Sequence, residues 1–215
     1  MTLSAGVVSA SEKQSATAAI LILLGVVLFV LTTVKLTVIW WTKEKLRSAH
    51  RLESSLYALH AILSSDADEA NPPKLRVTIH VPTPNEKELE QVLDYVGDSR
   101  AGATAGRKFS VSCGIIGEAF RRKETLAATR QSADTEGYVK ELIEDWGYTE
   151  SDARKRDHSA MSWLAIPLES GDKKRVEGIV YCDSVDPEFF TEIRTQLAYY
   201  ACVGIARCID ETYSK

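Results

Sequence analysis

An apolar run near the N-terminus constrains this chain more than any other feature of its sequence. Residues 18–41 carry a single charged side chain, Lys35. A helix needs about 20 apolar residues to cross the hydrocarbon core of a bilayer, and this run is long enough. The alternative is a secretory signal, whose apolar run has about 7–15 residues and ends at small residues. The run here is longer and ends in a tryptophan pair. We therefore expect a transmembrane helix over residues 17–41, after a short extracytoplasmic N-terminus at residues 1–16.

The residues that flank the run predict its direction in the membrane. Trp40 and Trp41 suit the interface between lipid and water, where amphipathic rings gather, and Lys35 lies close enough to extend toward the same surface. The N-terminal side has only Lys13, whereas the C-terminal side continues with four basic residues: Lys43, Lys45, Arg47 and Arg51. The positive-inside rule then places the N-terminus outside and the rest of the chain in the cytosol. This predicts a single-pass protein of the inner (plasma) membrane.

A connecting amphipathic helix is predicted over residues 42–64, which contain no Pro or Gly. Five apolar residues recur in it at alternating spacings of three and four: Ala49, Leu52, Leu56, Leu59 and Leu63. This spacing is typical of the seam of a parallel coiled coil, although it lasts only about two heptads, and three to four are usually needed. The stripe could equally pack on the chain's own domain. We predict a parallel homodimer through residues 45–63, with the four leucines in its seam.

The remaining sequence predicts one α+β domain over residues 74–212. Apolar and polar residues alternate over 74–81, as in a half-buried strand, and other short apolar runs are separated by segments with helical spacing. The predicted order is strands at 74–81 and 91–97, a loop at 98–106, a short helix at 114–121, a strand at 124–129, a helix at 135–157, strands at 162–168 and 176–183, and a last helix from Pro187 to about residue 212. The helices at the two ends must stack on one face of an antiparallel sheet to bury their apolar stripes.

The order of these elements resembles a GAF domain over about residues 45–212. The likeness is carried by Leu75-Arg-Val-Thr-Ile-His80, by Gly106-Arg107 with Gly114-Ile-Ile-Gly-Glu-Ala-Phe120, and by the two closing strands at 162–168 and 176–183. The resemblance implies a pocket for a small molecule between the sheet and the helices that face it, but not the identity of that molecule. Two signatures of known subtypes are missing from the sequence: the Asn-Lys-Phe-Asp-Glu motif of cyclic-nucleotide binders, and a Cys followed by His for a bilin.

Candidate ligand-binding residues lie on and beside the helix predicted at 135–157. Aromatic side chains with a few convergent polar groups are what a binding pocket needs. Tyr138 and Trp146 share one face of this helix, and Arg130 and His158 lie at its two ends. The alternative is that the two aromatic residues belong to the core and that Arg130 is solvated.

Catalytic and metal chemistry is not indicated by the sequence. The four histidines stand on separate elements, and none joins a Ser or Cys in a nucleophile motif. His80 alternates with apolar strand residues and is expected on a solvent-facing side, and Glu141 is expected to be a solvated helical charge. No Lys-Ser/Thr follows Gly114-x-x-Gly117, which favours tight packing of a short helix over a phosphate loop. The four cysteines have no metal-ligand spacing and are typical of reduced core residues.

These observations predict a membrane-anchored cytosolic sensor that is not an enzyme. The sequence names no cofactor, and a net charge of only −4 predicts no nucleic-acid partner. Expected partners are the membrane, a second copy of the chain, and either a small molecule, with nucleotides among the candidates, or a downstream protein. Two alternatives stay open. One is a nucleotide-triggered effector that oligomerises and disrupts the bilayer, and the other is a dimerisation module without a ligand.

Overall fold

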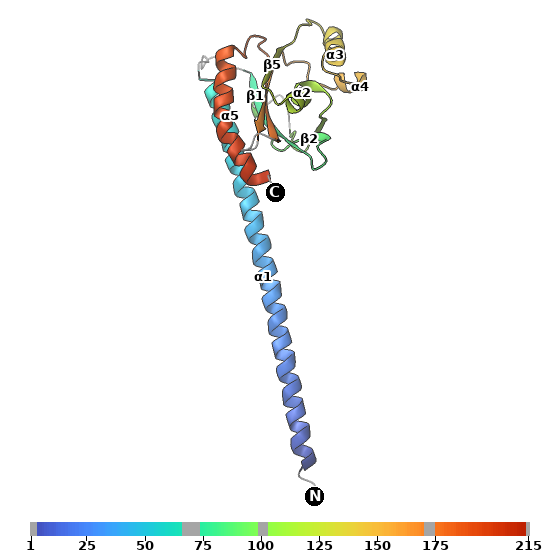
Figure 1. Cartoon of the computed structure of the whole chain (residues 1–215), viewed down its shortest axis with the longest axis vertical. Coiled ribbons are helices and arrows are strands. Elements are labelled where there is room, and N and C mark those ends of the chain that lie inside the picture. The colour runs from blue at the N-terminus through green and yellow to red at the C-terminus, as the bar shows by residue number, and fades with distance from the viewer. Residues whose placement is uncertain (1–3, 66–73, 99–102, 170–174, 214–215) are drawn as a thin grey trace. The chain divides into compact units, whose positions relative to one another are not determined.

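The structure is a computed structural model that describes residues 4–65, 74–98, 103–169 and 175–213 (Figure 1). The chain divides into two compact units, Met1–Arg47 and Ser48–Lys215. Helix α1 (Ser4–Leu63) contributes residues to both units. Residues 66–73, between α1 and the first strand, lie outside the described residues.

The first unit contains the N-terminal part of α1. Among the described residues, one segment, Leu21–Lys43, is long and apolar enough to cross a membrane, and none of it is buried. Four threonines in the segment each donate a hydrogen bond to the carbonyl oxygen four residues earlier: Thr32, Thr33, Thr37 and Thr42. Their hydroxyls are therefore satisfied within the helix, as an apolar environment requires. Residues 4–16 already belong to α1, so helix begins within the predicted N-terminal segment.

The second unit is built on an antiparallel sheet that has seven strands within the described residues. Its strand order is β4-β2-β1-β7-β6-β5, and β3 also pairs with β1. The strands are β1 (Leu75–Pro82), β2 (Glu88–Gln91), β3 (Val96–Gly97), β4 (Lys108–Ser110), β5 (Leu126–Thr129), β6 (Ser162–Glu169) and β7 (Val176–Ser184). The central strands β1, β7 and β6 are thus covered on both edges by other strands.

Helices cover both faces of this sheet (Figure 1). On the first face lie the C-terminal turns of α1 and helix α5 (Glu192–Tyr213), as predicted for the helices at the two ends of the domain. On the second face lie α2 (Gly114–Arg122), α3 (Thr135–Glu144) and the short α4 (Glu150–Ala153). Successive strand residues point to opposite faces, so β1 sends Leu75, Val77 and Ile79 into the first core.

The leucine stripe of α1 packs into the first core of its own chain. Leu52, Leu56, Leu59 and Leu63 are each at most 1% exposed, and they share a cluster with residues of β1, β6, β7 and α5. The structure therefore corrects their assignment to a dimer seam, because side chains already enclosed by their own domain offer no surface to a partner. The other interpretation of the stripe, packing within the chain, accounts for them.

Two predicted elements are interrupted in the structure. The helix expected over 135–157 is divided into α3 and α4, because Gly147 adopts a φ of 68° and Thr149 caps the second helix through the Asp152 amide. The strand expected over 91–97 is also divided, into β2 and β3. The Gln91 side chain donates to the Leu93 carbonyl oxygen at 3.0 Å and so holds the chain away from the ladder.

The two glycines of α2 have the packing role that the sequence indicated. A Cβ atom at Gly117 would lie 2.7 Å from the carbonyl oxygen of Val111. Gly114 has a φ of 73°, and a Cβ atom there would collide with the Tyr148 hydroxyl. Both glycines therefore allow α2 to approach the chain around it closely.

Candidate ligand-binding cavity

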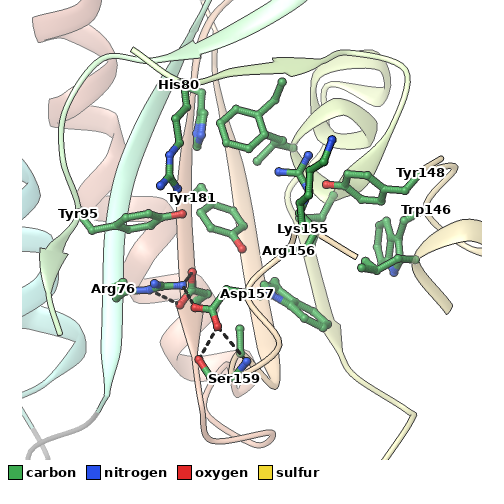
Figure 2. Close-up of a pocket in the computed structure, with 18 of the residues that line it drawn as sticks. Arg76, His80, Tyr95, Trp146, Tyr148, Lys155, Arg156, Asp157, Ser159 and Tyr181 are labelled. Atoms are coloured by element: carbon green, nitrogen blue, oxygen red, sulfur yellow. Dashed lines mark hydrogen bonds and ion pairs between the residues drawn. The ribbon is translucent and has the colours of Figure 1, made fainter. Parts of the chain in front are cut away.

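A cavity of about 630 Å³ lies on the second face of the sheet, within the second unit (Figure 2). Small-molecule sites in proteins have volumes of about 300–1,000 Å³. The sheet forms one wall, and α2, α3 and the chain after α4 form the others. The lining residues are Arg76, His80, Tyr95, Arg107, Phe109, Ile115, Ile116, Tyr138, Leu142, Trp146, Tyr148, Lys155, Arg156, Asp157, Ser159, Ala160, Trp163, Tyr181 and Asp183.

An ion-pair network forms the floor of the cavity. Arg76 and Asp183 are directly opposite each other on β1 and β7, and both are buried. Arg76 donates from Nε to Oδ1 and from Nη2 to Oδ2 of Asp183, each at 2.8 Å. Its Nη2 also lies 2.8 Å from Oδ2 of Asp157, on the chain that follows α4. The network therefore fastens that segment to the sheet, and Figure 2 shows these contacts as dashed lines.

The electrostatics of this network keep Arg76 charged. Burial alone would lower the pKa of Arg76, but the hydrogen bonds and the charge of Asp183 raise it above its usual value, with smaller contributions from Tyr95 and Asp157. The Tyr95 ring lies 4.5 Å from the guanidinium carbon. A buried cation with a bidentate carboxylate and an aromatic face is well satisfied, so Arg76 has a structural role in the floor.

His80 is the least satisfied polar group of the cavity. Its side chain is 1% exposed, and neither ring nitrogen has a hydrogen-bond partner among the described residues. Burial lowers the pKa of His80 to about 3, so the imidazole is neutral at pH 7. Its ring contacts the rings of Phe109 and Tyr181 edge to face, with centroids 5.0 and 5.9 Å away. A neutral imidazole with one donor and one acceptor thus lines the cavity without a protein partner.

Aromatic rings and a second arginine form the side of the cavity opposite Tyr95 (Figure 2). The guanidinium carbon of Arg156 lies 5.1 Å from the Phe109 ring centroid and 4.8 Å from that of Tyr148. Its buried Nε has no hydrogen-bond partner among the described residues. The Arg156 guanidinium is therefore held by ring faces, and its donors are not consumed by a carboxylate in the part of the chain that the structure describes.

The lining carries more positive than negative charge. It contains four basic residues, Arg76, Arg107, Lys155 and Arg156, against two acidic ones, Asp157 and Asp183, a formal sum of 4 − 2 = +2 with His80 neutral. The whole chain has a net charge of −4. Both acidic residues bind Arg76, so the other three basic side chains leave the cavity with an excess of positive charge.

The structure separates the four ligand-binding residues that the sequence suggested. Tyr138 and Trp146 line the cavity, and Arg130 and His158 do not. Arg130 donates to the carbonyl oxygens of Ser132, Asp134 and His158 at 2.6, 2.6 and 2.9 Å, and its guanidinium carbon lies 4.4 Å from the Tyr138 ring centroid. Arg130 is therefore not a solvated side chain, because it joins the chain before α3 to the chain after α4.

Two further expectations about polar residues are wrong. His80 does not face solvent, because α2 and its neighbours cover the face of β1 on which it lies. Glu141 is 8% exposed and accepts hydrogen bonds from the amides of Gln131 and Ser132 and from the Ser132 hydroxyl. It therefore fixes the chain before α3.

Cysteine and metal chemistry has little support around the cavity. Cys182 and Cys202 are buried, as predicted, whereas Cys113 is only half-buried; the Cys208 side chain lies outside the described residues. Burial is the main cause that raises the pKa of the Cys113 thiol. Within the described residues, no group of three or more His, Cys, Asp or Glu side chains is placed to hold a metal ion.

Comparison with known proteins identifies the fold. No family model and no curated protein matches the sequence. Among solved structures, the chain is similar to the GAF domain of an Acinetobacter phosphoenolpyruvate-protein phosphotransferase, with 15% identity, a TM-score of 0.51, and coverage of 80% of this chain and 95% of that one. The GAF-B domain of DevS from Mycobacterium smegmatis has 14% identity, a TM-score of 0.48, and coverage of 76% and 96%.

One similar structure is an enzyme, the type II free methionine-R-sulfoxide reductase from Thermoplasma acidophilum. It has 13% identity and a TM-score of 0.48, with coverage of 75% of this chain and 96% of that one. The similarity to the Acinetobacter GAF domain shows that the second unit has the GAF fold, as the resemblance predicted, and the antiparallel sheet between helices agrees with it. At these identities the likeness establishes the fold and no shared ligand or activity.

Proposed function

We propose that this chain is a membrane-anchored sensor whose GAF-fold domain binds a small molecule in the cavity of the second unit. The observation that supports this most strongly is the double role of β1. One face of this strand contributes Arg76 and His80 to the cavity, and the other contributes Leu75, Val77 and Ile79 to the core that holds α1. A molecule bound in the cavity thus lies one strand away from the helix that continues toward the N-terminus.

The proposed route of the signal runs from β1 to the leucine stripe of α1. Packed cores transmit small displacements because they cannot deform freely, and Leu56 and Leu59 have almost no exposed surface. A ligand that binds one arrangement of β1 more tightly than another would shift the population of α1 positions by that difference in affinity. The output then passes to another protein or to a second copy of the chain.

The membrane anchor and its direction are part of the proposal. The exposed apolar surface of Leu21–Lys43 supports insertion, and the basic residues after it support a cytosolic domain. An impermeant thiol reagent on intact cells should label Ala5→Cys and should not label Lys87→Cys, although both should be labelled after permeabilisation. Labelling of Lys87→Cys alone on intact cells would reverse the orientation, and protection of both would place both positions inside.

A homodimer is proposed through α5, in place of the leucine stripe. This helix exposes large apolar side chains on the side away from the core: Ile193 at 71%, Leu197 at 44%, Tyr200 at 69% and Val203 at 62%. Exposed apolar patches of this kind commonly mark association surfaces. Chemical cross-linking of the full chain in detergent should give a dimer in the wild type and in Lys87→Glu, and only a monomer in Tyr200→Glu. An uncross-linked wild type would contradict the dimer.

The ligand proposal is tested by what the purified protein carries. Small molecules released by heating the full chain would be identified by mass spectrometry for the wild type and two variants. Ala160→Trp places an indole in the cavity at a position that is 2% exposed. Ala61→Trp places the same side chain at an exposed position of α1. We expect a molecule bound by the wild type and by Ala61→Trp to be lost from Ala160→Trp. Equal retention by all three proteins would contradict a ligand in this cavity.

A further inference from the structure

The cavity has an uncompensated charge and an unsatisfied hydrogen-bonding group, and each indicates a property of the ligand. Its lining has an excess of positive charge, with Arg107 and Lys155 exposed to solvent and Arg156 half-buried. It also contains the buried His80, whose ring nitrogens have no partner among the described residues. Buried polar groups are normally hydrogen-bonded, and an unsatisfied one is destabilising. A ligand that carries a negative charge and a hydrogen-bonding group would balance the positive charge and give His80 a hydrogen-bond partner.

We propose that the cavity binds a small organic anion that carries a flat ring, with Arg156 as its main charged contact and His80 as a hydrogen-bonding contact. This inference rests on the proposed function, because it names the chemical class of the molecule sensed in the same cavity. The anionic group is a carboxylate or a phosphate, since the guanidinium fork of arginine matches both. The ring is accommodated by aromatic side chains.

The position of Arg156 makes it the first choice for the charged contact. Arg76 is already consumed by Asp183 and Asp157, and Lys155 lies 3.5 Å from Asp152 on its own segment. Arg156 instead lies over the rings of Phe109 and Tyr148. A cation held over ring faces retains its in-plane donors for an anion.

The aromatic residues indicate the shape of the rest of the ligand. The rings of Tyr138 and Trp163 are stacked in parallel, with centroids 5.8 Å apart and an interplanar angle of 6°. Tyr95 and Tyr181 meet edge to face across the cavity floor, at 6.4 Å. Walls of flat rings favour a flat partner because ring pairs gain energy beyond the apolar area that they bury. His80, which lies beside Tyr181 in Figure 2, would hydrogen-bond a polar edge of that partner.

The test compares matched anionic and neutral probes. Equilibrium dialysis of the full chain in nanodiscs would be performed with AMP against adenosine, GMP against guanosine, and indole-3-acetate against indole-3-acetamide. Each variant's melting curve would first establish that it is folded. We expect at least one anion to be retained and its neutral counterpart to be retained at least about tenfold less, as the loss of a charge-assisted hydrogen bond predicts. The nucleotide and carboxylate arms distinguish the two sources of negative charge.

Two variants assign the charged contact. Arg156→Gln should weaken the retained anion by about tenfold or more, and Arg156→Lys should restore part of the affinity. Arg154→Gln is the matched control, because Arg154 lies two residues away, binds Glu136 and Glu150, and does not line the cavity. It should change the affinity by less than about threefold, as expected for an exposed ion pair.

The remaining outcomes overturn the inference. Equal retention of charged and neutral probes would refute anion recognition and leave the small-molecule function standing, since a ligand would still be bound. Retention of an anion that is insensitive to Arg156→Gln would place the charged contact elsewhere. If no anion is retained while heated wild-type protein releases a neutral or cationic compound, the ligand class is wrong and the proposed function stands. If nothing is retained or released, both fail.

Discussion

Truncation of Leu56 tests how the second unit is held together. This side chain is fully buried in the core that α1 shares with β1, β6, β7 and α5. Replacing a buried leucine by alanine costs about 2–5 kcal/mol, because the apolar transfer energy is lost and a cavity remains. For a domain of this size, each kcal/mol lowers the melting temperature by about 2–4 °C. We therefore expect Leu56→Ala to lower the melting temperature of the second unit by roughly 4–20 °C.

The matched control is the adjacent residue. Tyr57 is 57% exposed, and surface substitutions usually change stability by less than about 0.5 kcal/mol. Tyr57→Ala should therefore melt within about 2 °C of the wild type. Near-ultraviolet circular dichroism of the full chain in detergent would follow the loss of packed aromatic side chains in each protein.

Protein concentration separates this explanation from a dimer seam. If Leu56 packs within its own chain, the difference between wild type and Leu56→Ala should be the same at two concentrations that differ tenfold. If the leucine lies between two chains, the difference between the wild type and Leu56→Ala should change with concentration, and the variant should be monomeric by sedimentation. Either that result or a Leu56→Ala melting curve that matches the Tyr57→Ala curve would refute the packing of Leu56 within its own chain.

Three further expectations follow from the same contacts. A fragment of residues 48–215 should fold without detergent. A fragment of residues 65–215 should be insoluble or unfolded, because the first core loses four buried leucines. Equal solubility of the two fragments would contradict this expectation. The pKa of His80 is lowered to about 3, so the unfolded chain binds a proton that the folded chain does not. Stability should fall as the pH decreases from about 6.5 toward 3, by up to about 1.4 kcal/mol per pH unit, and His80→Gln should flatten this slope in urea titrations. Arg76→Met leaves Asp183 buried without its bidentate partner. Urea unfolding should show that the free energy of unfolding falls by about 3–5 kcal/mol. A loss below about 1 kcal/mol would mean that the pair is solvated.

Local signals in the sequence were sufficient for much of the fold. The strands at 162–168 and 176–183 were predicted because each is a mostly apolar segment of strand length and a charged segment separates them, and β6 and β7 occupy these positions. The short helix at 114–121 agrees with α2 because two glycines and an apolar face mark it. The interruption of the strand predicted at 91–97 was not foreseen, because nothing in the local sequence shows that the Gln91 side chain will donate to the Leu93 carbonyl oxygen.

The cavity was harder to predict because alternation does not say what covers each face of a sheet. In β1 the polar residues Arg76, Thr78 and His80 alternate with apolar ones, which is also the pattern of a strand with one solvent-facing side. In the structure all three are at most 4% exposed. The signal that was available is the chemistry of these residues: Arg76 lies opposite Asp183 and Thr78 lies opposite Tyr181 on β7, and with His80, whose ring contacts that of Tyr181, they form a polar layer inside the protein.

The chain after α4 shows why charge alone is ambiguous. Residues 154–157 read Arg-Lys-Arg-Asp, and such a run is usually a solvated surface. Only the tertiary contacts distinguish the roles of these side chains. Arg154 binds Glu136 at the surface, Arg156 lies over rings of the cavity, and Asp157 reaches Arg76 in the floor. Neighbouring residues of like type thus have different roles, because a short loop directs successive side chains to different surroundings.

The position of Asp157 connects ligand binding to the shape of the cavity. Its carboxylate is 39% exposed at the side chain, whereas its partner Arg76 is 4% exposed, so the ion pair joins a solvent-accessible segment to the buried floor. Asp157 directly follows Arg156 in the sequence, so an anion that moved Arg156 would also act on the backbone that carries Asp157. Arg76, the partner of Asp157, lies on the strand whose other face supports α1. A change in this one ion pair would reach β1 directly, and through β1 the core in which the leucine stripe of α1 packs.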